Sequence, residues 1–118
     1  MYYIAVDMGE SNRYSMGEFE RAVLVVLIRL GENAYGALIR RTLSERLDRD
    51  VAIGAVYTTL QRLEDKGYVS SFMGEPTPER GDRAKRFFRI EAPGEEALAK
   101  SQARSDVLLA IPALDGAR

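Results

Sequence analysis

The chain has 118 residues, a net charge of −1, and neither cysteine nor histidine. This length supports one small domain, and the missing residue types exclude Cys/His zinc sites, thiol or Ser-His nucleophiles and disulfides. The near-neutral total conceals a basic segment, because Arg80, Arg83, Lys85, Arg86 and Arg89 lie within eleven residues that contain the single acid Asp82.

Other function classes are excluded by missing motifs. No apolar run approaches the roughly 20 residues of a membrane-spanning helix, and the N-terminus lacks the basic and apolar regions of a secretory signal. The sequence also has no GxSxG elbow, phosphate-cradling glycine loop or metal-ligand cluster. We therefore expect a soluble cytoplasmic protein that is not an enzyme and needs no cofactor, and the absence of cysteine fits a reducing compartment.

Residues 1–15 show no clear hydrophobic period and precede a second plausible start at Met16. We predict that they form a loosely attached arm. An extra strand over residues 2–6 and a true start at Met16 are the alternatives.

The first predicted helix covers residues 17–30, where apolar side chains recur at helical spacing. Its main apolar face consists of Phe19, Val23, Val26, Leu27 and Leu30. Leu24 and Ile28 extend the apolar surface to the side. A stripe this wide predicts burial on two sides, one of them against a partner subunit.

The second predicted helix runs from about Ala34 to Asp48, with Gly31 ending the helix before it and Asn33 as its N-cap. The residues predicted to point inward are Tyr35, Leu38, Ile39, Leu43 and Leu47. The residues predicted to point outward are Arg40, Arg41, Glu45 and Arg46. A short link over residues 49–52 leads into a third helix.

The third predicted helix lies within residues 51–69 and ends at Lys66 and Gly67, a cation and a glycine suited to a helix C-terminus. One stripe predicts core packing: Ile53, Val56, Leu60 and Leu63. The opposite side carries Gly54, Ala55, Thr58, Gln61, Arg62 and Asp65, with Tyr57 and Thr59 on the flanks. Small and hydrogen-bonding side chains of this kind suit the base edges of a DNA major groove. A plain solvated face is the alternative.

Two segments with strand periodicity follow, residues 68–73 and 85–90, separated by the loop GEPTPERGDRA. Pro76, Pro78 and Gly81 exclude a helix between them. A helix-turn-helix followed by a basic hairpin is a winged helix, so the predicted fold is mainly α with a small β-hairpin. In this fold the third helix lies in the major groove, and the wing reaches phosphates or the minor groove.

The last predicted helix starts with Pro93 at its first position, carries Glu95 and Glu96 near its positive end, and continues to about Ala110. Its apolar side is too sparse for a helix that stands alone. We predict that it dimerises, and that the contact comprises Leu24, Ile28, Leu98, Val107, Leu108 and Ile111. Completion of a monomer core is the alternative.

The predicted organisation is therefore an N-terminal arm (1–15), a winged helix-turn-helix DNA-binding domain (16–91), a C-terminal dimerisation helix (92–112) and a tail (113–118). Several segments across it form a recognisable combination: AYGALIRRTLSERL, GAVYTTLQRLEDKGYVSS, GEPTPERGDRAKRFFRI and APGEEAL. Together they cover most of residues 17–98. In this order they resemble the PadR-type winged-helix transcriptional regulators of bacteria.

The resemblance implies a repressor that binds a near-palindromic operator as a homodimer. It releases the operator when a signal changes the spacing of the DNA-binding domains of the two subunits. The resemblance also implies that Tyr57 fixes the recognition helix on the phosphate backbone. The chain departs from the family in having Thr58 where proline is common, and Phe87 and Phe88 where tyrosines are common. Relatives can hold a small aromatic effector between their dimerisation helices, but this chain has no tryptophan there and the resemblance names no effector residue.

Ten residues are candidates for contact with double-stranded DNA: Ala55, Tyr57, Thr58, Thr59, Gln61, Arg62, Arg80, Arg83, Lys85 and Arg86. We expect base contacts from Thr58, Gln61 and Arg62, although Arg62 has a surface pair with Asp65 as its alternative. The hairpin cations are expected to contact phosphates. The competing hypothesis is a winged helix used only for protein interaction, which gives no reason for so many basic residues around a proline-rich tip.

Overall fold

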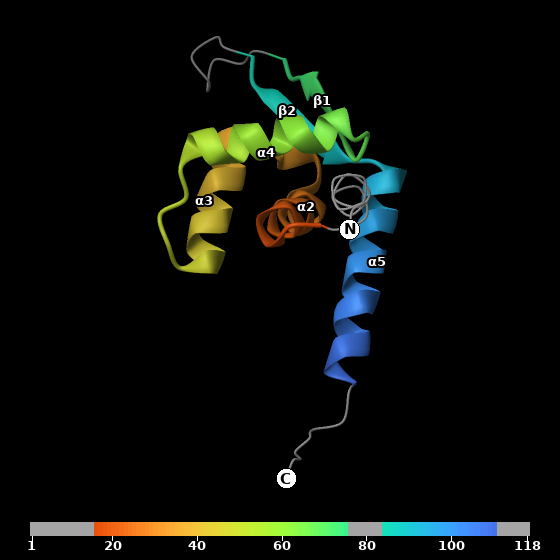
Figure 1. Ribbon diagram of the computed structural model, residues 1–118. Coiled ribbons are helices and arrows are strands. Elements are labelled where there is room, and N and C mark those ends of the chain that lie inside the picture. The colour runs from red at the N-terminus through yellow and green to blue at the C-terminus, as the bar shows by residue number, and fades with distance from the viewer. Residues whose placement is uncertain (1–15, 76–83, 111–118) are drawn as a thin grey trace, which may run out of the picture.

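A computed structural model describes residues 16–75 and 84–110. Figure 1 shows the arrangement of their elements. In chain order these are α2 (Glu18–Leu30), the 3-10 helix η1 (Gly31–Asn33), α3 (Gly36–Leu47), α4 (Ile53–Asp65), β1 (Val69–Met73), β2 (Arg86–Ile90) and α5 (Ala92–Leu109). The fold is mainly helical with one two-stranded antiparallel hairpin, as predicted. The predicted arm at 1–15, most of the loop between the strands and the end of the chain from Ile111 lie outside the described residues.

The core lies where α4 crosses α2 and α3 (Figure 1). Each of these helices contributes most of the apolar stripe that its sequence spacing predicts, and the hairpin adds Val69 and Phe88. The core side chains are Val23, Leu24, Val26, Leu27, Ala34, Ile39, Leu43, Val51, Val56, Leu60, Leu63, Val69 and Phe88. Burial of this apolar surface is the main source of stability for a domain of this size.

Helix α2 is buried over a wider arc than the sequence suggested. It contacts α3, α4, β2 and α5, and one side of the helix stays exposed at Val25 and Ile28. The prediction that Leu24 belongs to an exposed flank is wrong, because its exposed fraction is 0%. Ile28, one turn further, is exposed as predicted.

Helix α3 begins later than predicted, because η1 occupies Gly31–Asn33 and Tyr35 is the N-cap residue. The prediction that Asn33 caps this helix is therefore wrong. Tyr35 forms an isolated antiparallel bridge with Phe87, and the Phe88 N–H donates to the Ala34 carbonyl over 2.8 Å. This pairing draws the start of α3 toward the hairpin. At the other end, the prediction that Leu47 points inward is wrong, because its side chain is exposed in the last turn of α3.

Helix α4 ends at Asp65 with Lys66 as its C-cap, and Gly67 takes the left-handed position after it as predicted, which explains how β1 can follow within a few residues. Gly67 has a φ of +80°, in the left-handed region that glycine favours. Its N–H donates to the Glu64 carbonyl, and the Tyr68 N–H donates to the Leu63 carbonyl, each over 2.9 Å. These two bonds form a Schellman motif that satisfies the last carbonyls of the helix.

The hairpin pairs Val69 with Ile90 and Met73 with Arg86 at its two ends. Because side chains alternate across a strand, Phe88 and Arg86 share the face that packs toward the core, and Phe87 and Arg89 share the opposite face. Phe87 is nevertheless buried, because Tyr35 and Phe72 cover it with ring centroids 5.7 and 5.6 Å away.

Helix α5 leaves the hairpin and runs away from the other helices (Figure 1). Ala92 is its first residue, so Pro93 is the second helical residue. The prediction that Pro93 is the first residue of this helix is wrong by one position. Gly94 lies against the residue before β1, since a Cβ there would come within 2.4 Å of the Tyr68 carbonyl oxygen. Arg21 of α2 donates to the side chains of Gln102 and Ser105, over 2.6 and 3.2 Å, and these bonds join α5 to α2. None of the described helices is long and apolar enough to cross a membrane.

Candidate nucleic-acid interface

The turn before α4 is held by side chains of α3. The Val51 N–H donates to the Ser44 hydroxyl over 3.1 Å, and the Arg40 guanidinium contacts the same hydroxyl and the Val51 carbonyl. Among the described residues, no side chain hydrogen-bonds to the N-terminus of α4 as a cap. The positive end of this helix is thus fixed in place and open to an anionic group such as a phosphate.

The outward face of α4 is small and polar in its first half, as predicted. Gly54, Ala55, Thr58, Gln61 and Arg62 are all exposed. A Cβ built on Gly54 meets open space, with no described atom within 4 Å. This half of the helix can approach another molecule closely.

Two residues of α4 do not lie where the sequence stripe predicted. Thr59 was a candidate for DNA contact, but only 5% of its surface is exposed. It lies one turn after Val56 and one turn before Leu63, so it extends the buried stripe. Ile53 was expected in the core and is 43% exposed, because it is the first residue of α4 and lies at the edge of the packed surface.

Tyr57 lies across the start of α3. A Cβ at Gly36 would come within 2.1 Å of the Tyr57 hydroxyl oxygen, so only glycine leaves room for this ring. The Tyr57 ring also packs edge-on against Phe88, with centroids 6.3 Å apart. Its hydroxyl is therefore placed beside the N-terminus of α3, a second position that favours an anion. Sequence reasoning missed the role of Gly36, although a glycine at the predicted start of a helix was a usable signal.

Gln61 and Arg62 lie on different sides of α4: Gln61 is on the outward face, and Arg62 is on the flank beside α2. The Gln61 amide donates to the Asp65 carboxylate over 3.0 Å. Arg62 lines a hollow beside the start of α2, together with Phe19 and Lys66. Arg62 is consequently on the flank away from Tyr57, and the two residues would meet different parts of a duplex.

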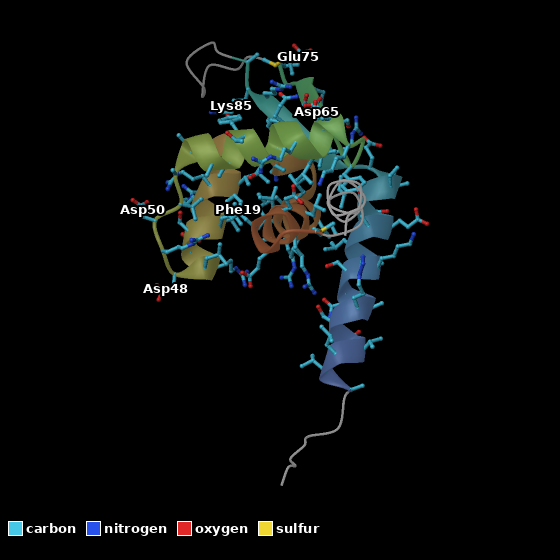
Figure 2. All side chains as sticks on the ribbon, viewed as in Figure 1. Phe19, Asp48, Asp50, Asp65, Glu75 and Lys85 are labelled. Atoms are coloured by element: carbon cyan, nitrogen blue, oxygen red, sulfur yellow. The ribbon has the colours of Figure 1, made fainter. Side chains whose placement is uncertain are left out.

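The described cations of the hairpin rest on aromatic rings or acids. The Lys85 ammonium lies 4.7 Å from the centroid of Tyr35, and Arg89 lies 5.0 Å from that of Phe72. In Figure 2, Lys85 lies on the same outer side of the molecule as α4. Arg86 instead pairs with Glu64 of α4 at 3.2 Å. Arg80 and Arg83, two further candidates, lie outside the described residues.

Charge is distributed unevenly along this surface. The N-terminal half of α4, which includes Tyr57, carries no charged side chain, while its C-terminal end carries Glu64 and Asp65 together with Arg62 and the cap residue Lys66. A polyanion at the first half of the helix would therefore meet no carboxylate of the helix itself, whereas at the C-terminal end it would meet charges of both signs. Within the described ranges, no cluster of acidic side chains is suited to hold a metal ion.

The residues predicted to dimerise fall into two groups. Leu24 is buried in the protomer, and Leu98 is half-buried against the protomer's own core. Ile28 is exposed, and Val107 and Leu108 are each 67% exposed near the end of α5. Ile111 lies outside the described residues. The exposed residues leave apolar surface uncovered on α2 and on the projecting part of α5.

Comparison with known proteins identifies a family. The model of the transcriptional regulator PadR-like family matches residues 23–100. No curated protein matches the chain.

Solved structures have the same fold. A PadR-like transcription factor from Bacteroides fragilis is 20% identical, with a TM-score of 0.65 and coverage of 87% of this chain and 92% of that one. A PadR-family regulator from Eggerthella lenta is 24% identical, with a TM-score of 0.62 and coverage of 90% and 86%. A Streptococcus transcriptional regulator is 27% identical, with a TM-score of 0.63 and coverage of 77% and 84%.

The family match spans α3, α4, the hairpin and the start of α5, which are the elements that build the surface described above. The fold of the solved regulators agrees with it, and these proteins are regulators and not enzymes. The chain belongs to the PadR-like family of transcriptional regulators.

Proposed function

We propose that this protein is a repressor that binds a near-palindromic operator as a homodimer in the cytoplasm. The observation that carries the proposal is the exposed, small and polar first half of α4, which includes Tyr57 and has an N-terminus without a side-chain cap. A helix of this kind fits the major groove, where residues near the start of a recognition helix reach base edges.

Within this proposal, Thr58 and Gln61 read bases from the centre of the outward face, and Ala55 allows close approach. Arg62 contacts DNA from the flank beside α2. Tyr57 and Lys85 contact phosphates on the other flank, and Arg80 and Arg83 add charge from the wing tip. Truncation of a base-reading side chain is expected to cost about 1–3 kcal/mol on the operator alone.

The homodimer in this proposal forms through the apolar part of α5 and the exposed side of α2. Val107 and Leu108 are uncovered in the protomer, and Ile28 adds apolar surface on α2. A two-fold axis would place the two α4 helices about 34 Å apart, one turn of DNA, and so double the bases read. A small aromatic effector held between the two α5 helices is the signal that the family suggests.

The direct test is binding of the purified protein to labelled DNA from upstream of its own gene, measured by fluorescence anisotropy at several salt concentrations. We expect tight binding to one duplex and weaker, steeply salt-dependent binding to random duplexes. Thr58→Ala and Gln61→Ala should weaken only the first. A folded dimer that binds no duplex would favour the hypothesis of a protein-interaction module instead.

A further inference from the structure

Glu64 in the last turn of α4 is bonded to both strands of the hairpin. Its carboxylate accepts from the Ser71 hydroxyl of β1 over 3.0 Å and from the Arg86 guanidinium of β2 over 3.2 Å. The same guanidinium donates to the Ser71 hydroxyl over 3.0 Å. The three side chains thus form a closed triangle between α4, β1 and β2, which we name the clasp.

The position of Arg86 follows from the strand register. Ser71 pairs with Phe88, and Arg86 precedes Phe88 by two residues, so all three lie on the face of the hairpin directed at α4. The Arg86 guanidinium also lies 5.4 Å from the centroid of the Phe88 ring. Arg86 is therefore directed toward the recognition helix, unlike Lys85 and Arg89 on the opposite face.

The chemistry of the clasp is unexpected for a surface that meets DNA. A carboxylate on the recognition helix repels phosphates, and its pairing with Arg86 removes one cation from the wing's contribution to binding. An ion pair this exposed contributes little to folding, because solvent screens it. A contribution to the stability of the fold therefore does not explain why these three side chains are arranged in this way.

We infer that Glu64 and Arg86 are positioning residues that set the angle of the wing against α4, so that both can engage one duplex. This inference rests on the proposed DNA binding and assigns Arg86 a different role from that of a phosphate contact. It predicts that removal of an acidic residue weakens binding to DNA, the opposite of the simple electrostatic effect.

The decisive variant is Glu64→Gln, which removes a negative charge from the protein and breaks the ion pair. We expect its affinity for the operator duplex to fall about five- to tenfold, with an unfolding midpoint close to that of the wild type. Asp65→Asn is the matched control, because it makes the same charge change at the next residue, and it should bind equally or more tightly. Equal or tighter binding by Glu64→Gln would overturn the inference and restore Arg86 as a phosphate contact.

A double-mutant cycle and a DNA-free measurement complete the test. Arg86→Gln and the Glu64→Gln/Arg86→Gln double variant should lose as much affinity as Glu64→Gln alone, because each removes the same clasp. In the free protein, amide hydrogen exchange in β1 and β2 should be faster in Glu64→Gln than in Asp65→Asn. Independent, additive losses or unchanged exchange would count against the clasp. If the wild type binds no duplex, the proposed function fails instead, whatever the exchange shows.

Discussion

At the scale of single residues, the proposed recognition helix α4 depends on one glycine of the neighbouring helix α3. Gly36 lies beneath the Tyr57 ring, and any side chain there would occupy the space of the Tyr57 hydroxyl. Gly54 is also helical but faces open space. Gly36 is therefore needed for the packing of Tyr57, whereas Gly54 leaves space in which another molecule can come close to α4.

This difference predicts opposite effects on stability. Gly36→Ala should lower the free energy of unfolding by about 1–3 kcal/mol, because the Tyr57 ring must move away from Phe88. Gly54→Ala should leave stability unchanged or raise it by up to about 1 kcal/mol, because alanine favours the helix. Urea denaturation of both variants measures the difference, and equal losses would show that Tyr57 does not pack on Gly36 as described.

Ile39 and Ile53 provide a matched test of the observed burial. Ile39 is fully buried in α3, whereas Ile53 is 43% exposed at the start of α4. Ile39→Ala should cost about 2–5 kcal/mol through lost burial and a cavity, and Ile53→Ala should cost clearly less, about 1 kcal/mol. Thermal unfolding of the pair checks this order. A larger loss at Ile53 would place that side chain in the core after all, as the sequence stripe alone indicated.

At the scale of elements, the turn between α3 and α4 fixes the position and direction of α4, the proposed recognition helix. Ser44 joins the two helices, because its hydroxyl accepts the Val51 N–H just before α4 begins. The turn has a left-handed residue at Asp48, the C-cap of α3, so the chain reverses within a few residues. The start of α4 is consequently placed by α3 and not by a cap of its own.

We therefore expect Ser44→Ala to lower stability by about 1–3 kcal/mol through the unpaired Val51 N–H. Operator binding should weaken as well, since the start of α4 would no longer be held. Ser44→Thr keeps the hydroxyl and is the control. Denaturation and anisotropy titrations on the same samples separate the two effects, and an unchanged operator affinity would show that other contacts aim α4.

At the scale of the whole molecule, α5 carries apolar side chains that the protomer does not cover. The exposed Val107 and Leu108 lie on the part of α5 that runs clear of the other helices (Figure 1). Apolar surface that projects in this way is typical of an interface between copies of a chain.

The proposed homodimer should accordingly dissociate in Leu108→Asp, and binding to the proposed operator should weaken at least tenfold, because one reading helix alone contacts few bases. Met73→Asp makes a similar apolar-to-acid change on the hairpin and should leave the dimer intact. Sedimentation equilibrium of both variants measures the outcome. A dimer that survives Leu108→Asp would move the interface away from this end of α5.

The sequence by itself determined the elements and their order, because hydrophobic spacing and glycine at helix ends are local properties of the chain. The winged helix, the left-handed Gly67 after α4 and the family resemblance all followed from such patterns. The tertiary structure decided which parts of each stripe are covered: Leu24 and Thr59 are buried and Ile53 is exposed, because the width and edge of a buried face depend on the neighbours that pack there. It also decided that Arg86 pairs with Glu64, a contact across 22 positions that no local pattern specifies.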